Sequence, residues 1–374
     1  MKHPMDGLVK PPRKVLVEAG LEDGELVRCL RSTLPRADFR VLEKISDRSS
    51  FDPEVLEVVD FRGRFLKSCP GTRHYHCCGY QILHFGIQCT LGCSYCILQA
   101  YLNQPNLQIF GNWEALFTEI EEKLRAQPSR LHRIGTGEFT DSLLLDPWTG
   151  FSRRLVSFFA RQPNAVLELK TKTNHVGNLR GLDHRRRTIA AWSLNAPYIR
   201  GREETAAASL RARLEAARAC ARWGYPLAFH FDPLVEYPRW KDGYARILDR
   251  LLDSADPGQI VWISLGCFRF MPSLRSAVLA RHPRSGVLLG EFVRGLDGKM
   301  RYFRDIRVEM YSFMVERIRK ADPGLCVYLC MEGEDIWREV FGFQPGEKGG
   351  LPAMLDRAAR ERTGIEDGAS QKNP

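Results

Sequence analysis

The stretch that decides the fold is YQILHFGI at residues 80–87, which runs through Gln88 into Cys89-Thr-Leu-Gly-Cys93-Ser-Tyr-Cys96. The first part is an apolar run of strand length, and the second is a CxxxCxxC motif with an aromatic residue before its third cysteine. Eleven cysteines placed at random over 374 positions would produce about 0.01 such motifs, so chance is a poor explanation. We therefore start from a buried strand that ends in a cysteine loop.

Helix and strand patterns alternate downstream of this loop. Asn112 can cap a helix that carries Leu116, Ile120 and Leu124 at helical spacing. Repeated strand–helix units indicate a parallel sheet, here an α/β fold with a partial or complete (β/α) barrel. Its active site would lie at the C-terminal ends of the strands. The strands are expected at residues 131–135, 165–170, 188–193, 226–231 and 259–265, and the clearest helix at 203–223.

We expect four segments along the chain. Residues 1–78 form a small N-terminal α/β extension, with strands at 14–18 and 38–42 around a helix at 23–33, and residues 79–285 form the barrel. Residues 286–347 contain a β-hairpin of residues 287–294 and 300–304 with Asp297-Gly298 at its turn, then a helix after Asp305 and a strand that ends in VYLCME. Residues 348–374 are polar and Gly-rich, which predicts a flexible tail.

Composition excludes several classes of protein. Hydrophobic residues make up 44% of the chain and charged residues 27%, which is typical of a soluble globular protein and excludes a wholly disordered or fibrous one. No stretch reaches the roughly 18–20 apolar residues that span a bilayer, and the N-terminus lacks the apolar core of a signal peptide. These observations favour a cytoplasmic protein without a membrane partner. The excess of 55 Lys and Arg over 45 Asp and Glu is compatible with a nucleic-acid partner.

Three thiols in one loop suit an iron–sulfur cluster. A [4Fe–4S] cluster is normally held by four thiolates, so three leave one iron open. The open iron can chelate the amino and carboxylate groups of S-adenosylmethionine, and an electron from the cluster then breaks the sulfonium bond to give a 5′-deoxyadenosyl radical. The alternative is structural zinc held by these cysteines and a histidine such as His74 or His76. Motif and barrel together favour the radical cluster.

At this point the sequence resembles the spore photoproduct lyase family of radical S-adenosylmethionine proteins. CTLGCSYCILQAYL is similar to the family's cluster loop, and LELKTKTNHV, AAWSLNAPY and RLEAARACARWGYPLAFHFDPL continue the likeness. VYLCMEGEDIWREVFG is similar to the C-terminal motif of the non-spore members. The resemblance covers most of residues 80–345. It implies a partial (β/α)6 barrel of the TIM type and, in the founding branch, a carbon–carbon lyase that reverses a thymine dimer in DNA.

The resemblance also implies roles for individual residues. Cys89, Cys93 and Cys96 would hold the cluster, and Tyr95 would be a radical relay. The S-adenosylmethionine site would be lined by Lys172, Ser193 and Asn195, together with Glu138, whose carboxylate could accept the cofactor's ammonium group. The alternative for Glu138 and Lys172 is an ordinary surface salt bridge.

One departure from the family concerns the thiol that returns a hydrogen atom to the product radical. In the photoproduct lyase that cysteine follows the second barrel strand, where this chain reads GEFTDS at residues 137–142, and Ile97 replaces a second tyrosine near the cluster. Cys267, at the end of a late strand, is the candidate replacement, and a structural role in the core is the alternative. Cys69, Cys77 and Cys78 could form a second metal site with Cys326 and Cys330 if the two regions meet, and separate packing is the alternative.

A basic and aromatic hairpin is the candidate nucleic-acid face. Its residues are Lys299, Arg301, Tyr302 and Arg304, which could set cations on phosphates and a ring against a displaced base. A second basic run, HRRR at residues 184–187, is expected in a loop. We therefore predict a radical S-adenosylmethionine enzyme that acts on damaged DNA or another nucleic acid and takes electrons from a low-potential donor such as flavodoxin or ferredoxin. The alternatives are a radical enzyme for an RNA base, a peptide or a small metabolite, and a zinc-stabilised nucleic-acid-binding module without catalysis.

Overall fold

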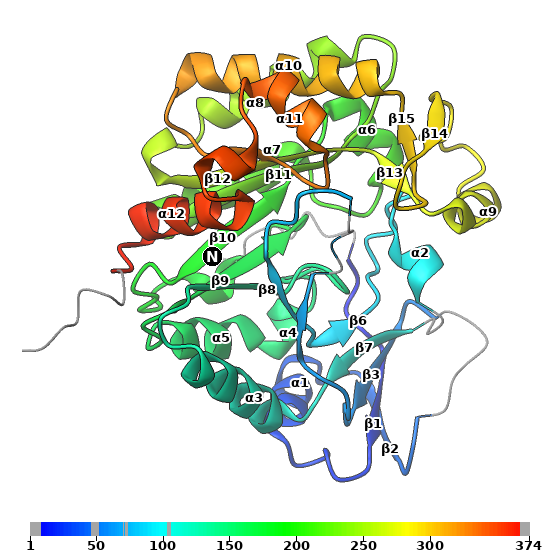
Figure 1. The fold of residues 1–374 in the computed structure, drawn as a ribbon. Helices are drawn as coiled ribbons and strands as arrows, with labels where there is room; N and C mark the ends of the chain where they lie inside the picture. Colours follow the sequence, from blue (N-terminus) through cyan, green and yellow to red (C-terminus); the bar gives the residue numbers. More distant parts are fainter. Residues whose placement is uncertain (1–8, 46–51, 70, 72–73, 103–105, 367–374) are drawn as a thin grey trace, which may run out of the picture.

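The computed structural model describes residues 9–45, 52–69, 71, 74–102 and 106–366. A curled eight-stranded sheet forms a half barrel, and a five-stranded sheet and a three-stranded sheet lie beside it (Figure 1). None of the helices in these residues is both long enough and apolar enough to cross a membrane. The predicted α/β class and partial barrel are confirmed.

The curled sheet has the strand order β16-β12-β11-β10-β9-β8-β5-β4. All neighbours in it are parallel except β4 and β5, which are antiparallel. The five barrel strands expected from the sequence are all present, because each is a short apolar run between helical patterns. The strands are β4 (Leu66–Ser68), β5 (Gln81–Leu83), β8 (His132–Gly135), β9 (Ala165–Thr171), β10 (Thr188–Ser193), β11 (Leu227–Leu234), β12 (Ile260–Cys267) and β16 (Val327–Leu329).

Amphipathic helices cover the outer face of the curled sheet and bury their apolar sides against it. They are α3 (Trp113–Ala126), α5 (Phe151–Phe159), α7 (Leu210–Arg222), α8 (Trp240–Leu252) and α10 (Arg304–Ala321). The expected helix at 203–223 is present as α7, but it begins at Leu210; residues 204–209 are not helical, and a separate helix, α6 (Pro197–Glu203), ends before them. The shorter helices are α2 (Leu98–Tyr101), α4 (Asp146–Thr149), α9 (Pro272–Arg281) and α11 (Glu334–Phe341).

The N-terminal extension shares its sheet with the cysteine-loop region. Its five strands have the order β2-β1-β3-β7-β6, with α1 (Glu25–Thr33) packed beside them. The predicted single strand at 80–87 is broken: β5 joins the curled sheet, whereas residues 86–87 join the N-terminal sheet, because the chain crosses between the sheets at His84 and Phe85. The expected boundary at residue 78 therefore does not separate two sheets. The strands are β1 (Lys14–Glu18), β2 (Asp38–Leu42), β3 (Val55–Val59), β6 (Gly86–Ile87) and β7 (Leu107–Phe110).

The predicted hairpin exists but is short. β14 (Phe292–Arg294) and β15 (Met300–Tyr302) pair antiparallel around a turn at Gly298, whose φ of +78° suits glycine. β13 (Arg269–Phe270) adds a third strand on the other side of β15.

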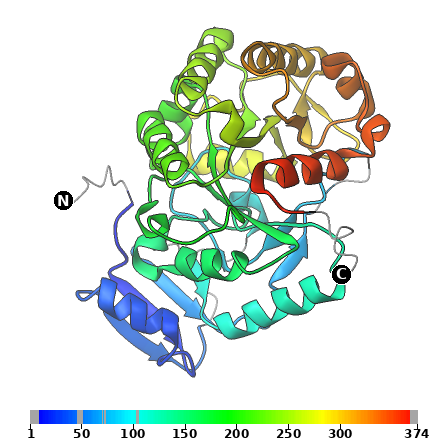
Figure 2. The same cartoon turned by 90° about the vertical axis from the view of Figure 1, so that its left-hand side faces the viewer.

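The predicted flexible tail from residue 348 is wrong for most of its length. Helix α12 (Leu351–Thr363) packs on β12, and its buried residues include Leu351 and Leu355. Arg133, whose side chain is 5% exposed, binds Asp356 of this helix at 2.6 Å. Figure 2 shows α12, in red, lying across the barrel. Its polar residues and flanking glycines hid a narrow apolar stripe; residues 367–374 lie outside the described residues.

We expect Leu355→Ala to lower the free energy of unfolding by about 2–5 kcal/mol, because it leaves a cavity under α12. Urea denaturation would measure the change. Glu361→Ala, at an exposed position of the same helix, is the matched control and should change stability by less than about 0.5 kcal/mol. Equal stability of both variants and the parent would mean that this segment is the flexible tail after all.

Candidate cluster site at the cysteine loop

The cysteine loop follows β6 and leads into α2. Gly92, with φ +60°, allows the tight turn between the first two cysteines. The amide of Cys96 donates to the carbonyl of Cys93 at 3.1 Å, and the side-chain amide of Gln99 donates to the same carbonyl at 3.1 Å. The motif is thus wrapped on itself by its own backbone.

The three cysteines of the loop lie at different depths: Cys93 is buried, and Cys89 and Cys96 are partly buried. Burial raises the pKa of each, for Cys93 to about 12, and the nearby Lys172 ammonium opposes this rise at Cys93 and Cys96. Cys93 and Cys96 further raise the pKa of Cys89, which places the three sulfurs within electrostatic reach of one another. Three thiols in one loop near a cation are the type of donor that an iron–sulfur cluster uses, since thiolates bound to metal carry negative charge.

A buried ion pair holds the middle of the loop. The hydroxyl of Tyr95 donates to Glu204, and Glu204 pairs with Arg213 at 2.5 Å, both charged side chains being at most 1% exposed. Arg213 also donates to the carbonyls of Ser193 at 2.9 Å and of Ala208 at 3.0 Å. Tyr95 is thereby tied to the C-terminal end of β10.

A second tie involves the residue before Tyr95. The amide of Ser94 donates to the carbonyl of Glu203 at 2.9 Å, and its hydroxyl bonds the Glu203 carboxylate. The same carboxylate accepts from Ser285 at 2.6 Å and from the amide of Gly286 at 3.0 Å. Glu203 is 2% exposed and so joins the cysteine loop to the chain after α9.

Lys172 lies with the loop, as expected from the sequence. Its ammonium sits 5.7 Å from the Tyr95 ring centroid, and its backbone amide donates to Asp141 at 2.7 Å. Asp141 also accepts from Thr171 at 2.7 Å and raises the pKa of Cys89. Asp141 was missed by sequence reasoning, although it stands in the same GEFTDS segment that contains Glu138.

The other three predicted cofactor residues are already partnered. Glu138 pairs with Lys170 at 2.6 Å, Ser193 lends its carbonyl to Arg213, and Asn195 bonds Tyr244 at 2.7 Å and the carbonyl of Pro233 at 2.9 Å. All three follow the C-terminal ends of barrel strands, on the edge that the sequence analysis predicted.

Two polar pairs inside the barrel were also missed, the buried pair of Glu168 and His230 and the partly buried pair of Asp232 and Arg269. Glu168 bonds His230 at 2.5 Å and accepts from Trp262 at 3.3 Å. Asp232 and Arg269 pair at 3.0 Å. Their only signal in the sequence is a charged residue inside an apolar strand run, such as Glu168 in AVLELKT, where a strand buried on both faces would otherwise be apolar throughout.

Cys267 points away from the barrel interior. Side chains alternate along a strand, and a Cβ at Gly266 would meet Asp232 and Arg269 inside, so Cys267 faces the helices. Its sulfur lies 4.0 Å from that of Met310 in α10, and the residue is 2% exposed. This orientation favours the alternative of a structural role in the core for Cys267.

The predicted nucleic-acid residues are mostly turned inward. Arg301 is 2% exposed and binds Asp297 at 2.7 Å, Lys299 is 8% exposed, and Tyr302 is fully buried with its oxygen accepting from the amide of Glu236. Arg304 is half-exposed but pairs with Asp335 at 3.1 Å and with Glu339. These side chains hold the hairpin to the barrel. The sequence could not predict this, because a basic run does not reveal where its acidic partners lie.

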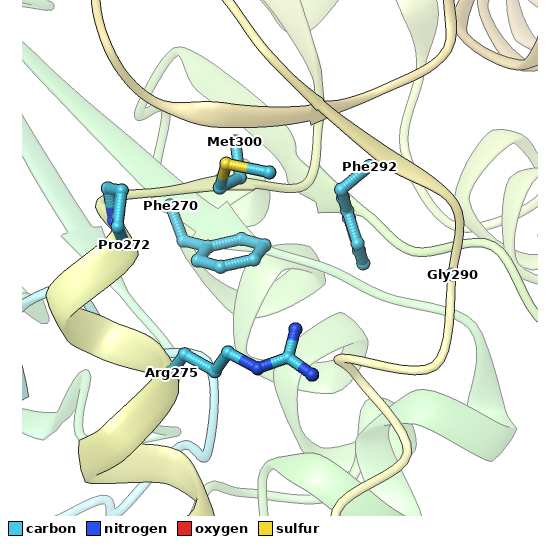
Figure 3. A pocket seen from close by; sticks show the side chains of 6 residues that line it. All are labelled: Phe270, Pro272, Arg275, Gly290, Phe292 and Met300. Carbon is cyan, nitrogen blue, oxygen red and sulfur yellow. The ribbon is translucent and has the colours of Figure 1, made fainter.

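The outer side of the hairpin sheet carries a different feature. Phe270, Phe292 and Met300 line a hollow of about 270 Å³ with Arg275 of α9 at its edge (Figure 3). The Phe270 and Phe292 rings meet edge to face at 5.1 Å.

In the second basic run, His184 is buried and stacks on Tyr225, and Arg186 donates to the carbonyl of Arg362, so this run too is partly anchored inside.

The two outlying cysteine groups meet across the open side of the half barrel. The amide of His76 donates to the carbonyl of Glu332 at 3.1 Å; Cys69 raises the pKa of Cys330, and Cys330 raises the pKa of Cys78. Arg269 donates to the Cys330 sulfur at 3.2 Å. Within the residues that the structure describes, no group of three or more His, Cys, Asp or Glu side chains is arranged to hold a metal ion, either at these two cysteine groups or in the cysteine loop.

The chain is similar in sequence to a known protein family. The family model described as spore photoproduct lyase matches residues 77–318. The spore photoproduct lyases of Bacillus subtilis (strain 168) and Geobacillus sp. (strain Y412MC61) are each 26% identical to the chain, over 211 and 210 residues. Each match covers 55% of this chain and 61% of the relative, so the chain spans less than two thirds of the relatives' length.

Solved structures share the fold. A spore photoproduct lyase complexed with dinucleoside spore photoproduct superposes with a TM-score of 0.75 at 21% identity. A variant with bound AdoMet and dinucleoside spore photoproduct gives the same values. Both matches cover 86% of this chain and 100% of the solved chain.

We expect Glu204→Gln to lower the free energy of unfolding by about 3–5 kcal/mol, because it leaves Arg213 buried without its charge partner. Chemical denaturation of the metal-free protein would measure this. Glu215→Gln, which breaks the exposed Arg211–Glu215 pair on the same helix, is the control and should change stability by less than about 1 kcal/mol. Similar losses for both variants would contradict a special role for the buried pair.

Proposed function

The chain belongs to the spore photoproduct lyase family, and from this premise we propose that it is a radical S-adenosylmethionine enzyme that acts on a DNA lesion as a carbon–carbon lyase. The observation that carries the proposal is the set of three cysteines in one loop, Cys93 buried and Cys89 and Cys96 partly buried, beside the C-terminal edge of a half barrel. The family match includes the whole of this loop.

Cys89, Cys93 and Cys96 would hold a [4Fe–4S] cluster. When bound, that cluster supplies the electron that cleaves S-adenosylmethionine to a 5′-deoxyadenosyl radical. The chain's contribution is to keep the thiols together and dry, and Lys172 offsets part of the negative charge of their thiolates. Because burial raises the pKa of the thiols, loading must release protons and should be favoured at higher pH.

Glu138, Lys172, Ser193 and Asn195 would surround S-adenosylmethionine. The Glu138 carboxylate is suited to an ammonium group, since it already receives that of Lys170 and keeps a second oxygen. Ser193 and Asn195 are held rigidly through Arg213 and Tyr244, so they would position the cofactor rather than adapt to it.

Tyr95 is the candidate relay for the hydrogen atom. Its hydroxyl donates to Glu204, a carboxylate that can receive the phenolic proton when the ring loses an electron. Glu204 is kept ionised because Arg213 and Lys172 lower its pKa against the effect of burial. The GEFTDS segment contains no cysteine that could return the hydrogen atom, and this arrangement supports Tyr95 in that relay.

A second candidate is a radical enzyme for a substrate other than DNA, such as an RNA base, a peptide or a small metabolite. The inward orientation of Lys299, Arg301 and Tyr302 favours it, because the predicted phosphate-binding face is consumed by internal pairs. Salt-dependent binding of ultraviolet-irradiated oligonucleotides, without binding of unirradiated ones, would favour the DNA substrate.

We expect anaerobic reconstitution with iron and sulfide, followed by dithionite and S-adenosylmethionine, to yield 5′-deoxyadenosine, and Cys93→Ala to abolish it. Cys220→Ala, which removes a buried thiol of α7, is the matched control and should retain the product, as should Cys267→Ala. Chromatography of the quenched reaction measures it. A colourless protein that contains zinc and forms no 5′-deoxyadenosine would overturn the proposal and favour a zinc-stabilised module.

A further inference from the structure

An exposed apolar and cationic surface lies directly outside the cysteine loop. Helix α2 begins two residues after Cys96, and its outer side shows Ile97, 38% exposed, and Tyr101, 51% exposed. Helix α9 contacts α2 and adds Leu279, 58% exposed, and the chain that follows adds Leu289, 85% exposed. Large apolar side chains this exposed, on two helices in contact and on the chain that follows them, are typical of an interaction site.

The charged side chains of α9 and of the chain after it, up to residue 290, are positive, and the exposed Glu291 follows directly. Residues 97–102 contain no charged residue, and residues 272–290 contain three arginines and no aspartate or glutamate. Arg281 and Arg284 are exposed, and among the described residues neither has a carboxylate partner at ion-pair distance. Lys299 and Arg301, in contrast, both pair with the carboxylate of Asp297. A partner for this surface would be acidic.

The surface is joined rigidly to the loop beneath it. The carboxylate of buried Glu203 accepts from the hydroxyl of Ser94 inside the motif. It also accepts from the hydroxyl of Ser285 and from the amide of Gly286. Ser285 also donates to the hydroxyl of Ser94 at 3.3 Å. A body resting on Arg284 and Leu289 is therefore held at a fixed position relative to the cysteines.

We propose that Ile97, Tyr101, Leu279, Arg281, Arg284 and Leu289 form the docking surface for an acidic one-electron carrier protein. The inference rests on the proposed function, since the cluster must receive one electron for each cleavage of S-adenosylmethionine. The reduced carrier is oxidised by one electron and the cluster is reduced by one; no bond forms or breaks in this step. Exposed aliphatic side chains favour a protein over nucleic acid, whose interfaces are more polar.

The test compares two reductants on the reconstituted protein. The double variant Arg281→Glu, Arg284→Glu should lower the initial rate of 5′-deoxyadenosine formation roughly tenfold or more when a reduced acidic flavodoxin is the donor. With dithionite, which needs no docking, the rate should equal that of the parent. Added salt should slow the flavodoxin reaction of the parent and have little effect on that of the variant.

Arg222→Glu, Arg250→Glu is the matched control with the same change in net charge. These exposed arginines end α7 and α8, at the edge of the sheet opposite the loop, and the control should retain the flavodoxin rate. Leu289→Ser tests the apolar part without altering charge and should weaken flavodoxin-driven turnover alone.

Several outcomes would overturn the proposal. Equal loss with both reductants would assign the arginines to the loop's own structure, and an unchanged flavodoxin rate would place the carrier elsewhere. Loss of binding to an irradiated oligonucleotide with an intact flavodoxin rate would assign the surface to nucleic acid. If the parent makes no 5′-deoxyadenosine even with dithionite, it is the proposed function that fails, and the docking surface fails with it.

Discussion

The pairing of Glu204 with Arg213 is the interaction on which the site depends. A single carboxylate accepts the Tyr95 hydroxyl, and a single guanidinium reaches the end of β10 and the turn at Ala208. Both charges are fully buried, so neither can lose its partner without a large cost. The loop that bears the three thiols therefore cannot shift relative to the barrel without breaking this pair. Stability and function are coupled here more tightly than in a loop held by surface contacts.

The strand–helix alternation could be predicted because apolar periodicity encodes it directly. The five central barrel strands and the helix after Asn112 were found from this pattern. The pattern failed at α12, where exposed polar residues outnumber a stripe that includes Leu351 and Leu355, and at residues 80–87, where one apolar run serves two sheets. In both cases the deciding contact is distant in sequence.

The candidate site was predicted where residue type alone limits the chemistry, and missed where geometry decides. Three cysteines at fixed spacing and the lysine beside them were recognised. The side of β12 on which Cys267 falls depends on the register of the strand, which sequence does not reveal. Likewise, Arg301 looks free in the sequence because its partner Asp297 is bonded only once the hairpin has formed. Asp141, in a polar loop, and Glu203, at the end of α6, were missed because neither carboxylate has a distinctive signal in the sequence.

The short antiparallel pairing of β6 with β7 has a consequence for metal loading. Gly86 faces Ile109 and Ile87 faces Gln108, so the chain that contains the cysteines leaves and returns at one place on the N-terminal sheet. Joining the ends of a long loop costs conformational entropy. Here the pairing of β6 with β7 already holds the two ends together before any metal binds. A cluster that binds would have to order only the interior of the segment between β6 and β7, because its ends are already fixed. Preorganisation of this kind raises affinity without adding a ligand, so the N-terminal sheet, whose strands β1, β2 and β3 are remote from the thiols in sequence, contributes to how firmly iron is held.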